Sequence, residues 1–204
     1  MAFLLVFPLA ASGQTAPTDP TALRARDSHQ DLLIAADPYV SAERYKDAFG
    51  KHSPYPAGII AIDVYFRNDN SMPIRLNLNT IRLVISLPGV ERQRLEPLSP
   101  EDVTDRTLLK ADANPKLPRP FPFPRPSGGK SKPWVEMDTM LRSVAVPSDV
   151  LPPKGITHGF LFFDMNHDFE AVRDAHLYIP DLAFMGNNKA LFFFELDLSA
   201  TSAK

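Results

Sequence analysis

The densest group of side chains that could perform chemistry is the heptapeptide at residues 164–170, Asp-Met-Asn-His-Asp-Phe-Glu. Oxygen-bearing side chains occupy the first, third and fifth positions of a helix-loop-helix calcium loop, a spacing that suits a hard cation. These metal candidates are Asp164, Asn166 and Asp168. Such a loop also needs Gly at its sixth position and Glu at its twelfth, where this chain has Phe169 and Ala175. The competing interpretation is a polar turn, in which Asp168 caps a short helix over residues 169–173.

Three histidines offer a second possible chemistry, because an imidazole titrates near neutral pH and readily binds metals. They are His158, His167 and His176. A site near His158, Asp164 and His167 defines the alternative function that we consider, an exported metal-dependent hydrolase. The sequence has no HExxH pattern, and ordinary surface histidines explain these residues more simply. It also lacks GxSxG, a Walker loop and GxGxxG, so we predict no enzyme activity and no cofactor.

The composition is that of an ordinary globular protein with a hydrophobic core. The 204 residues are 44% hydrophobic and 23% charged, which is enough apolar content for one domain. A net charge of −2 without a basic stripe argues against nucleic acid as a partner. Cysteine is absent from the sequence, which excludes disulfides, thiolate zinc sites and thiol nucleophiles. The 21 prolines limit long helices and favour turns, strand edges and polyproline segments.

The strongest structural signal is a period of two within residues 58–70, which is typical of an extended β-strand. The apolar residues on one face of this strand are Ile60, Ile62, Val64 and Phe66. The residues on the other face are Ala61, Asp63, Tyr65 and Arg67. Because β-branched and aromatic residues dominate, the segment suits a half-buried, pleated surface. We predict that it is the central strand of the fold.

Similar patterns predict further strands and a few short helices around this strand. The expected strands are residues 29–36, 73–78, 81–85, 90–95, 159–164, 174–179 and 191–198. The expected helices are residues 41–50, 99–110 and 134–146. In the last strand, Phe192, Phe194, Leu196 and Leu198 share one face. The whole pattern predicts a mainly β protein, an antiparallel Ig-like β-sandwich with short helices and a proline-rich insert.

The proline-rich insert, residues 111–133, is the best candidate for binding a partner. Proline recurs at every second position from Pro118 to Pro126, which favours a polyproline II helix and excludes a place inside a sheet. Such a preordered strand docks in an aromatic groove at low entropic cost. The partner-binding candidates are Arg119, Phe121, Phe123 and Arg125. The two arginines are six positions apart and so share a face of a helix with three residues per turn. The alternative is that the insert is only a stiff spacer or loop.

The N-terminal residues 1–13 begin with an apolar run and end in small residues, the pattern of a secretory signal peptide that is cleaved before Gln14. A buried N-terminal strand is the alternative. We predict a flexible linker at residues 14–28 and a single Ig-like domain over residues 29–200. The apolar run is shorter than the about 20 residues that cross a bilayer, so we expect no stable membrane span after cleavage.

Three local features mark the ends and starts of the predicted strands. They are Phe66-Arg67-Asn68, the Pro73-Ile74 step, and Gly159, Leu161 and Phe163 followed by a strand near Leu177. Over residues 58–198 they resemble the telokin-like, immunoglobulin-fold accessory domains of exported bacterial proteins. The resemblance implies a binding or scaffolding role outside the cytoplasm, with no catalytic residues to carry over. We therefore expect a non-enzymatic, secreted or periplasmic domain whose partner is another envelope or secreted protein.

Overall fold

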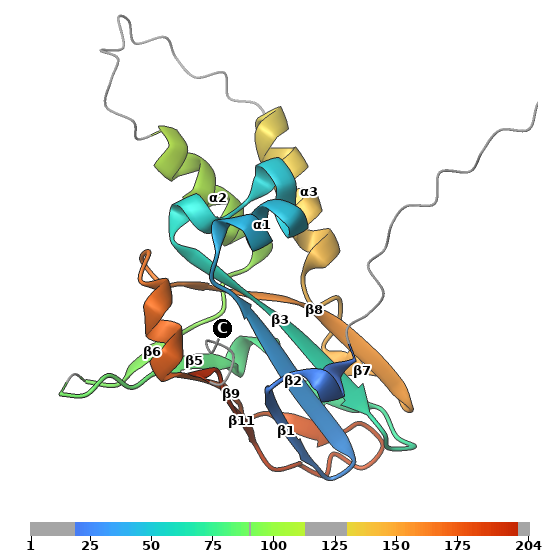
Figure 1. The fold of residues 1–204 in the computed structure, drawn as a ribbon. Helices are drawn as coiled ribbons and strands as arrows, with labels where there is room; N and C mark the ends of the chain where they lie inside the picture. The colour runs from blue at the N-terminus through green and yellow to red at the C-terminus, as the bar shows by residue number, and fades with distance from the viewer. Residues whose placement is uncertain (1–18, 90, 113–129, 200–204) are drawn as a thin grey trace, which may run out of the picture.

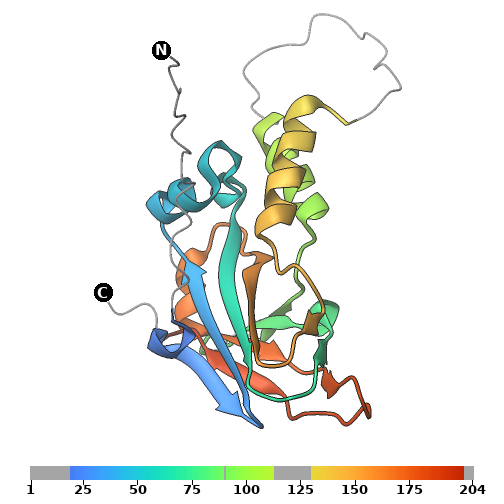
Figure 2. The ribbon, with the colours of Figure 1, turned by 90° about the vertical axis from the view of Figure 1, so that its right-hand side faces the viewer.

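The structure is a computed structural model that describes residues 19–89, 91–112 and 130–199 (Figure 1). Within these residues the fold is mainly antiparallel β-sheet with a few short helices, as the sequence predicted at this coarse level. Helices α1, α2 and α3 gather at one end of the strands in both views (Figures 1 and 2). The expected signal peptide lies outside the described residues.

The first sheet has the strand order β1-β2-β3-β8, and every neighbouring pair is antiparallel. Its strands are β1 (Ala25–His29), β2 (Leu32–Tyr39), β3 (Ile59–Asn68) and β8 (Gly155–Asp164). β3 is an interior strand, because it pairs with β2 on one side and with β8 along its whole length on the other. The central position predicted for residues 58–70 is therefore confirmed.

Two further sheets of shorter strands lie opposite the first. One has the order β10-β4-β7 and consists of β10 (Leu182–Phe184), β4 (Ile74–Leu76) and β7 (Val150–Leu151). The other has the order β11-β9-β5-β6 and consists of β11 (Phe194–Asp197), β9 (Ala175–Ile179), β5 (Arg82–Ile85) and β6 (Gln93–Leu95). The strands β7 and β10 were not predicted from the sequence, because no apolar alternation extends beyond their two and three residues. The equally short β4 lies within an alternating run over residues 73–78.

The α-helices lie where amphipathic patterns predicted them. In the described part of the chain they are α1 (Ala42–Phe49), α2 (Pro100–Asp112) and α3 (Lys132–Val144). The shorter 3-10 turns are η1 (Pro20–Ala22), η2 (Gly50–His52), η3 (Tyr55–Ala57), η4 (Leu78–Thr80) and η5 (Phe169–Asp174). Ser41 caps α1 by accepting a hydrogen bond from the Arg44 amide at 3.5 Å, and Gly50 ends the helix with a φ of 55°.

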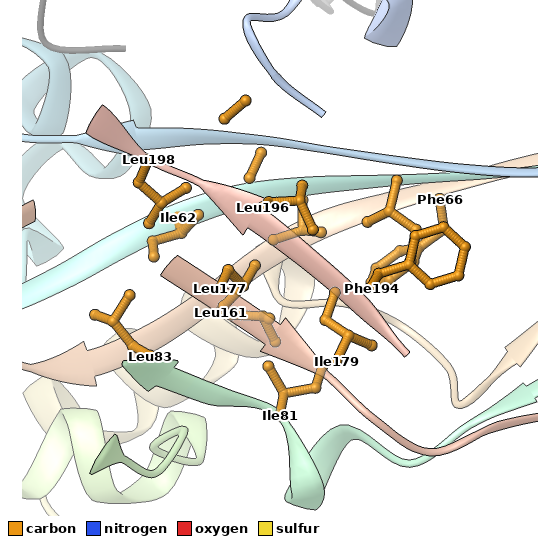
Figure 3. Packing of buried hydrophobic residues seen from close by; sticks show 14 of the residues in the cluster. Ile62, Phe66, Ile81, Leu83, Leu161, Leu177, Ile179, Phe194, Leu196 and Leu198 are labelled. Carbon is orange, nitrogen blue, oxygen red and sulfur yellow. The ribbon is translucent and has the colours of Figure 1, made fainter. Parts of the chain in front are cut away.

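The main core fills the space between the first sheet and the other two (Figure 3). Its residues from the first sheet include Ile62, Phe66 and Leu161, and those from the facing sheets include Leu83, Leu177, Ile179, Phe194 and Leu196. These are the alternate apolar positions of each strand, so the period of two in the sequence becomes one shared interior. Burial of this apolar surface is the dominant force that holds the layers together.

A second apolar cluster covers the other face of β3, beneath the helices. The helices contribute Tyr45, Phe49, Val103, Met137 and Leu141, and the sheet contributes Ile59, Ala61 and Phe162. The Tyr45 hydroxyl donates to the Ile59 carbonyl at 3.0 Å and accepts from the Ala61 amide at 2.7 Å. This hydroxyl satisfies the backbone of β3 beyond the end of β2, whose last pair is Tyr39 with Ala61. Both faces of β3 are therefore buried here, and the expected half-buried surface is wrong at this end.

The edge strands β1 and β11 lie next to each other and join the two layers on one side of the molecule. His29 of β1 stacks on Phe194 of β11, with ring centroids 3.7 Å apart. The Nε2 atom of His29 lies 3.1 Å from the Phe193 carbonyl oxygen. These contacts cover part of each exposed strand edge, which otherwise offers unpaired backbone groups to other chains.

Several predicted boundaries need correction. The 3-10 turn η1 and the first four residues of strand β1 lie within residues 14–28, so the expected linker does not extend to residue 28. The strand predicted at residues 29–36 is a hairpin that turns at Gln30 and Asp31, both with positive φ. β1 was missed because its sequence, Ala-Arg-Asp-Ser-His, has little apolar alternation, and its place in the sheet depends on backbone pairing with β2.

The start of β11 and the ends of the proline-rich insert also differ from the prediction. Phe192 does not share the buried face of Phe194, since 72% of its surface is exposed and β11 begins only at Phe194. The proline-rich insert is shorter than residues 111–133, because α2 extends to Asp112 and α3 begins at Lys132. Proline is tolerated in the first turn of α3, where its missing amide hydrogen would have no helical partner.

Candidate functional site

The three predicted metal candidates, Asp164, Asn166 and Asp168, lie at the end of β8 and in the turn that leads to η5. Asp164, at the end of β8, forms an ion pair with Arg106 of α2, and its Oδ1 accepts a hydrogen bond from the Asn166 amide at 3.0 Å. Asp168 precedes η5, but its side chain makes no capping hydrogen bond there. Within the described ranges, no group of three or more His, Cys, Asp or Glu residues is placed to hold a metal ion.

The residues of the alternative hydrolase site also lie apart. His158 and Asp164 are six positions apart on β8, so about 20 Å of strand separates them. His167 lies beyond the strand with its backbone against Gly58, where an added Cβ would be 2.5 Å from the His167 nitrogen. His176 belongs to β9, in another sheet. The fold therefore does not bring His158, Asp164 and His167 together.

A buried acid that the sequence analysis did not single out lies in the middle of β3. Asp63 is only 8% exposed, and its Oδ2 accepts a hydrogen bond from the Tyr65 hydroxyl at 2.9 Å. Its Oδ1 lies 3.6 Å from Nδ1 of His158 and has no partner at hydrogen-bonding distance. Burial raises the pKa of Asp63 above its ordinary value of 3.8, and the Tyr65 hydrogen bond and His158 oppose that rise.

A second acid lies directly opposite Asp63 on the neighbouring strand. Asp37 of β2 is in register with Asp63, and like charges in this position repel each other. Arg44 of α1 donates to both oxygens of Asp37, at 3.1 and 2.6 Å. The Arg44 guanidinium also lies 3.8 Å from the centroid of the Tyr39 ring. Arg44 therefore balances the charge of Asp37, and its two hydrogen bonds to a carboxylate go to Asp37 and not to Asp63.

His158 completes this polar group on the outer face of the first sheet. Its ring is parallel to that of Tyr65, with centroids 5.0 Å apart, and 52% of its side chain is exposed. A proton on His158 would therefore have the Asp63 carboxylate beside it. Acid–histidine pairs orient imidazoles in enzymes, but this one lies on a sheet surface. We therefore describe it as an acid–histidine contact within the sheet.

The predicted partner-binding residues of the insert, Arg119, Phe121, Phe123 and Arg125, lie outside the described residues, but both flanks of the insert are described. α2 and α3 lie side by side, and the end of the pair nearest the insert projects beyond the sheets (Figures 1 and 2). Nε1 of Trp134 donates to Asp105 at 2.6 Å, and the Lys130 ammonium lies 3.4 Å from the Trp134 ring centroid. Lys130 also donates to Glu101 at 2.5 Å. These contacts fasten the start of α3 to α2.

Two apolar side chains remain exposed on this helix pair. Leu109 of α2 is 68% exposed, and Val135 of α3 is 49% exposed. Leu109 lies in the last turn of α2 and Val135 in the first turn of α3, so both are close in sequence to residues 113–129. An amphipathic helix usually turns such side chains toward a protein core. Their exposure gives the flanks of the insert an apolar surface.

Comparisons with known proteins add no family to these observations. No protein-family model matches the chain, and no curated protein matches it. One matching solved structure is that of a functionally unknown protein from Listeria monocytogenes EGD-e. It is 11% identical with a TM-score of 0.35, and the alignment covers 76% of this chain and 68% of that chain. Among the described residues, no helix combines the length and apolar character needed to cross a membrane.

Proposed function

We propose that this chain is a non-enzymatic, secreted or periplasmic domain that binds another protein, as a partner or within an envelope assembly. The observation that carries the proposal is the helix pair that holds both ends of residues 113–129. This segment contains the arginines and phenylalanines that the sequence analysis selected as contact residues. Aromatic and arginine side chains dominate the binding energy of many protein interfaces.

The geometry of the flanks supports this proposal on energetic grounds. A segment whose two ends are fixed to packed helices has fewer accessible conformations than a free tail. Binding then costs less conformational entropy, which raises the affinity for a given set of contacts. The exposed side chains of Leu109 and Val135 would extend the apolar part of the same contact surface.

The finer assignment to the Ig-like β-sandwiches belongs to the same proposal. Antiparallel strands in two facing layers around one core support it. So does Asn68, the last residue of the Phe66-Arg67-Asn68 feature, which is fully buried. Its amide donates to the Met72 carbonyl at 2.9 Å and to the Pro152 carbonyl at 3.1 Å. These bonds tie the end of β3 to the segment before β4 and to the segment after β7.

The test is affinity capture from an envelope extract with a variant that removes the proposed contacts and keeps every proline. In this variant, Arg119, Phe121, Phe123 and Arg125 are all replaced by Ala. We expect proteins that the wild-type chain captures to fall at least tenfold with the variant, and a purified partner to lose affinity by a similar factor in calorimetry.

A matched control removes the same residue types from exposed positions elsewhere in the chain. The control replaces Arg92, Arg94, Phe192 and Phe193 by Ala, all of which are exposed in the structure. It should capture the same proteins as the wild-type chain. If the insert variant and the wild-type chain capture the same proteins in equal amounts, the insert is a spacer and the proposal is wrong.

A further inference from the structure

A groove lies at the other end of the helix pair, where the chain passes from the sheets into α2 and returns from α3. Its volume is about 320 Å³, which is at the lower end of the range of about 300–1,000 Å³ for small ligand sites. Most of its lining is apolar. The apolar residues that form its walls are Leu78, Leu98, Val146, Phe160, Leu161 and Phe162.

The groove lies beside β8, between the segment that precedes α2 and the segment that follows α3. The Leu98 amide donates to the Phe162 carbonyl at 2.8 Å, just before α2 begins. The Val146 amide donates to the Phe160 carbonyl at 3.3 Å, just after α3 ends. Both segments line the groove, and β8 supplies its floor. Because each segment is fixed to the strand by its backbone, the groove is largely preformed.

An acidic hollow adjoins the apolar groove and shares part of its wall. The hollow has a volume of about 330 Å³ and shares Pro97, Leu98 and Asp102 with the groove. It adds Glu96, Arg106 and Asp164, so its charged groups are three carboxylates and one guanidinium, a formal charge of −2. Arg106 already pairs with Asp164, and Glu96, 76% of whose side chain is exposed, pairs with Arg82 at 3.2 Å. With Arg82 counted, the formal charge around the hollow is −1. The combined surface therefore has an apolar part and a negatively charged part.

We propose that this groove binds a short peptide segment of a partner protein, with one or two apolar side chains in the groove and a Lys or Arg side chain at the acidic hollow. Charge complementarity favours a cationic residue, because carboxylates outnumber guanidiniums around the hollow and Asp102 has no arginine partner among the described residues there. The volume decides for a short segment with small or medium apolar residues. The inference rests on the proposed function as a binding domain, but it uses a different surface from the insert.

The test is a titration of the isotope-labelled, purified chain with two peptides, followed by nuclear magnetic resonance. The peptides are acetyl-Leu-Phe-Lys-amide and acetyl-Leu-Phe-Glu-amide. We expect the lysine peptide to shift the amide signals of Leu78, Leu98 and Val146 and to bind at least fivefold more tightly than the glutamate peptide. No shifts at these residues at millimolar peptide, or equal binding of both peptides, would overturn the inference.

A charge-reversal variant gives the matched control. Glu96→Lys should reverse the preference between the two peptides, because it places a cation at the acidic hollow. Glu170→Lys should leave the preference unchanged, since Glu170 is also an exposed partner of an arginine but lies outside both hollows. An unchanged preference in Glu96→Lys would contradict the assigned charge selectivity. These assays use no envelope extract, so their failure leaves the capture experiment on the insert intact.

Discussion

Asp63 is a buried carboxylate without a full set of partners, so its charge should cost stability at neutral pH. A raised pKa means that the folded protein holds this proton more tightly than the unfolded chain. The resulting stability is present below the ordinary value of 3.8 and is lost as the pH rises through the folded pKa. Asp63→Asn should therefore unfold at a higher temperature than wild type at pH 7, and the difference should shrink as the pH falls toward 4.

The same substitution on the opposite strand is the control for this prediction. Asp37 has Arg44 on both of its oxygens, so Asp37→Asn should lower the unfolding temperature at pH 7. Both variants can be followed by circular dichroism melts across pH 4–8. A lower melting temperature for Asp63→Asn at pH 7 would show that His158 compensates the charge of Asp63.

Asn68 uses its whole amide in the interior and should be among the most sensitive single positions. Its Nδ2 faces the carbonyls of Met72, Leu151 and Pro152, and its Oδ1 accepts from the Asn70 amide at 3.0 Å. Asn68→Ala should cost about 2–4 kcal/mol in chemical denaturation, since each buried group left unpaired costs about 1–3 kcal/mol. Asn70→Ala, at a half-buried position nearby, should cost about 1 kcal/mol. Similar losses for the two variants would contradict this ranking.

At the scale of elements, Gly159 decides how closely the segment after α3 approaches β8. A Cβ at this position would lie 2.6 Å from the Val146 nitrogen and from the Ala145 carbonyl carbon, both of which are backbone atoms. Gly159→Ala should therefore destabilise the protein by about 1–3 kcal/mol, as overpacking does elsewhere. Gly186→Ala is the control, because the nearest atom to its new Cβ would be the Met72 sulfur at 3.6 Å. Equal unfolding midpoints for the two variants would mean that the segment moves away freely.

The elements that could be predicted from the sequence are those in which apolar residues repeat at a regular spacing over more than one helical turn or several strand positions. The alternate residues Ile60, Ile62, Val64 and Phe66 and the helical pair Tyr45 and Phe49 belong to this class, and all are buried as their spacing indicated. The strands β1, β7 and β10 were not predictable, because their pairing depends on backbone groups supplied by other segments of the chain. Asp63 and His158 illustrate the same limit for the site, since register between β3 and β8 places them together.

For the whole molecule, the burial of β3 on both faces and along both edges makes it the centre of cooperative unfolding. Its amides from Ile60 to Phe66 should be among the slowest to exchange with solvent, because they open only when the whole domain unfolds. The amides of Gln93 and Arg94 in the exposed edge strand β6 should exchange much sooner. Hydrogen exchange at single-residue resolution would contradict this picture if the two strands exchanged at similar rates.

The contact between the edge strands β1 and β11 bears on whether the chain can be circularly permuted. The described chain starts and ends on the same side of the molecule (Figure 2). A circular permutant could join Ser199 to Asp19 through a short Gly/Ser bridge and open within residues 113–129, which connect α2 to α3. Every strand would keep its neighbours in the sheets. We therefore expect the permutant to reach the same native fold, although its strands are synthesised in a different order.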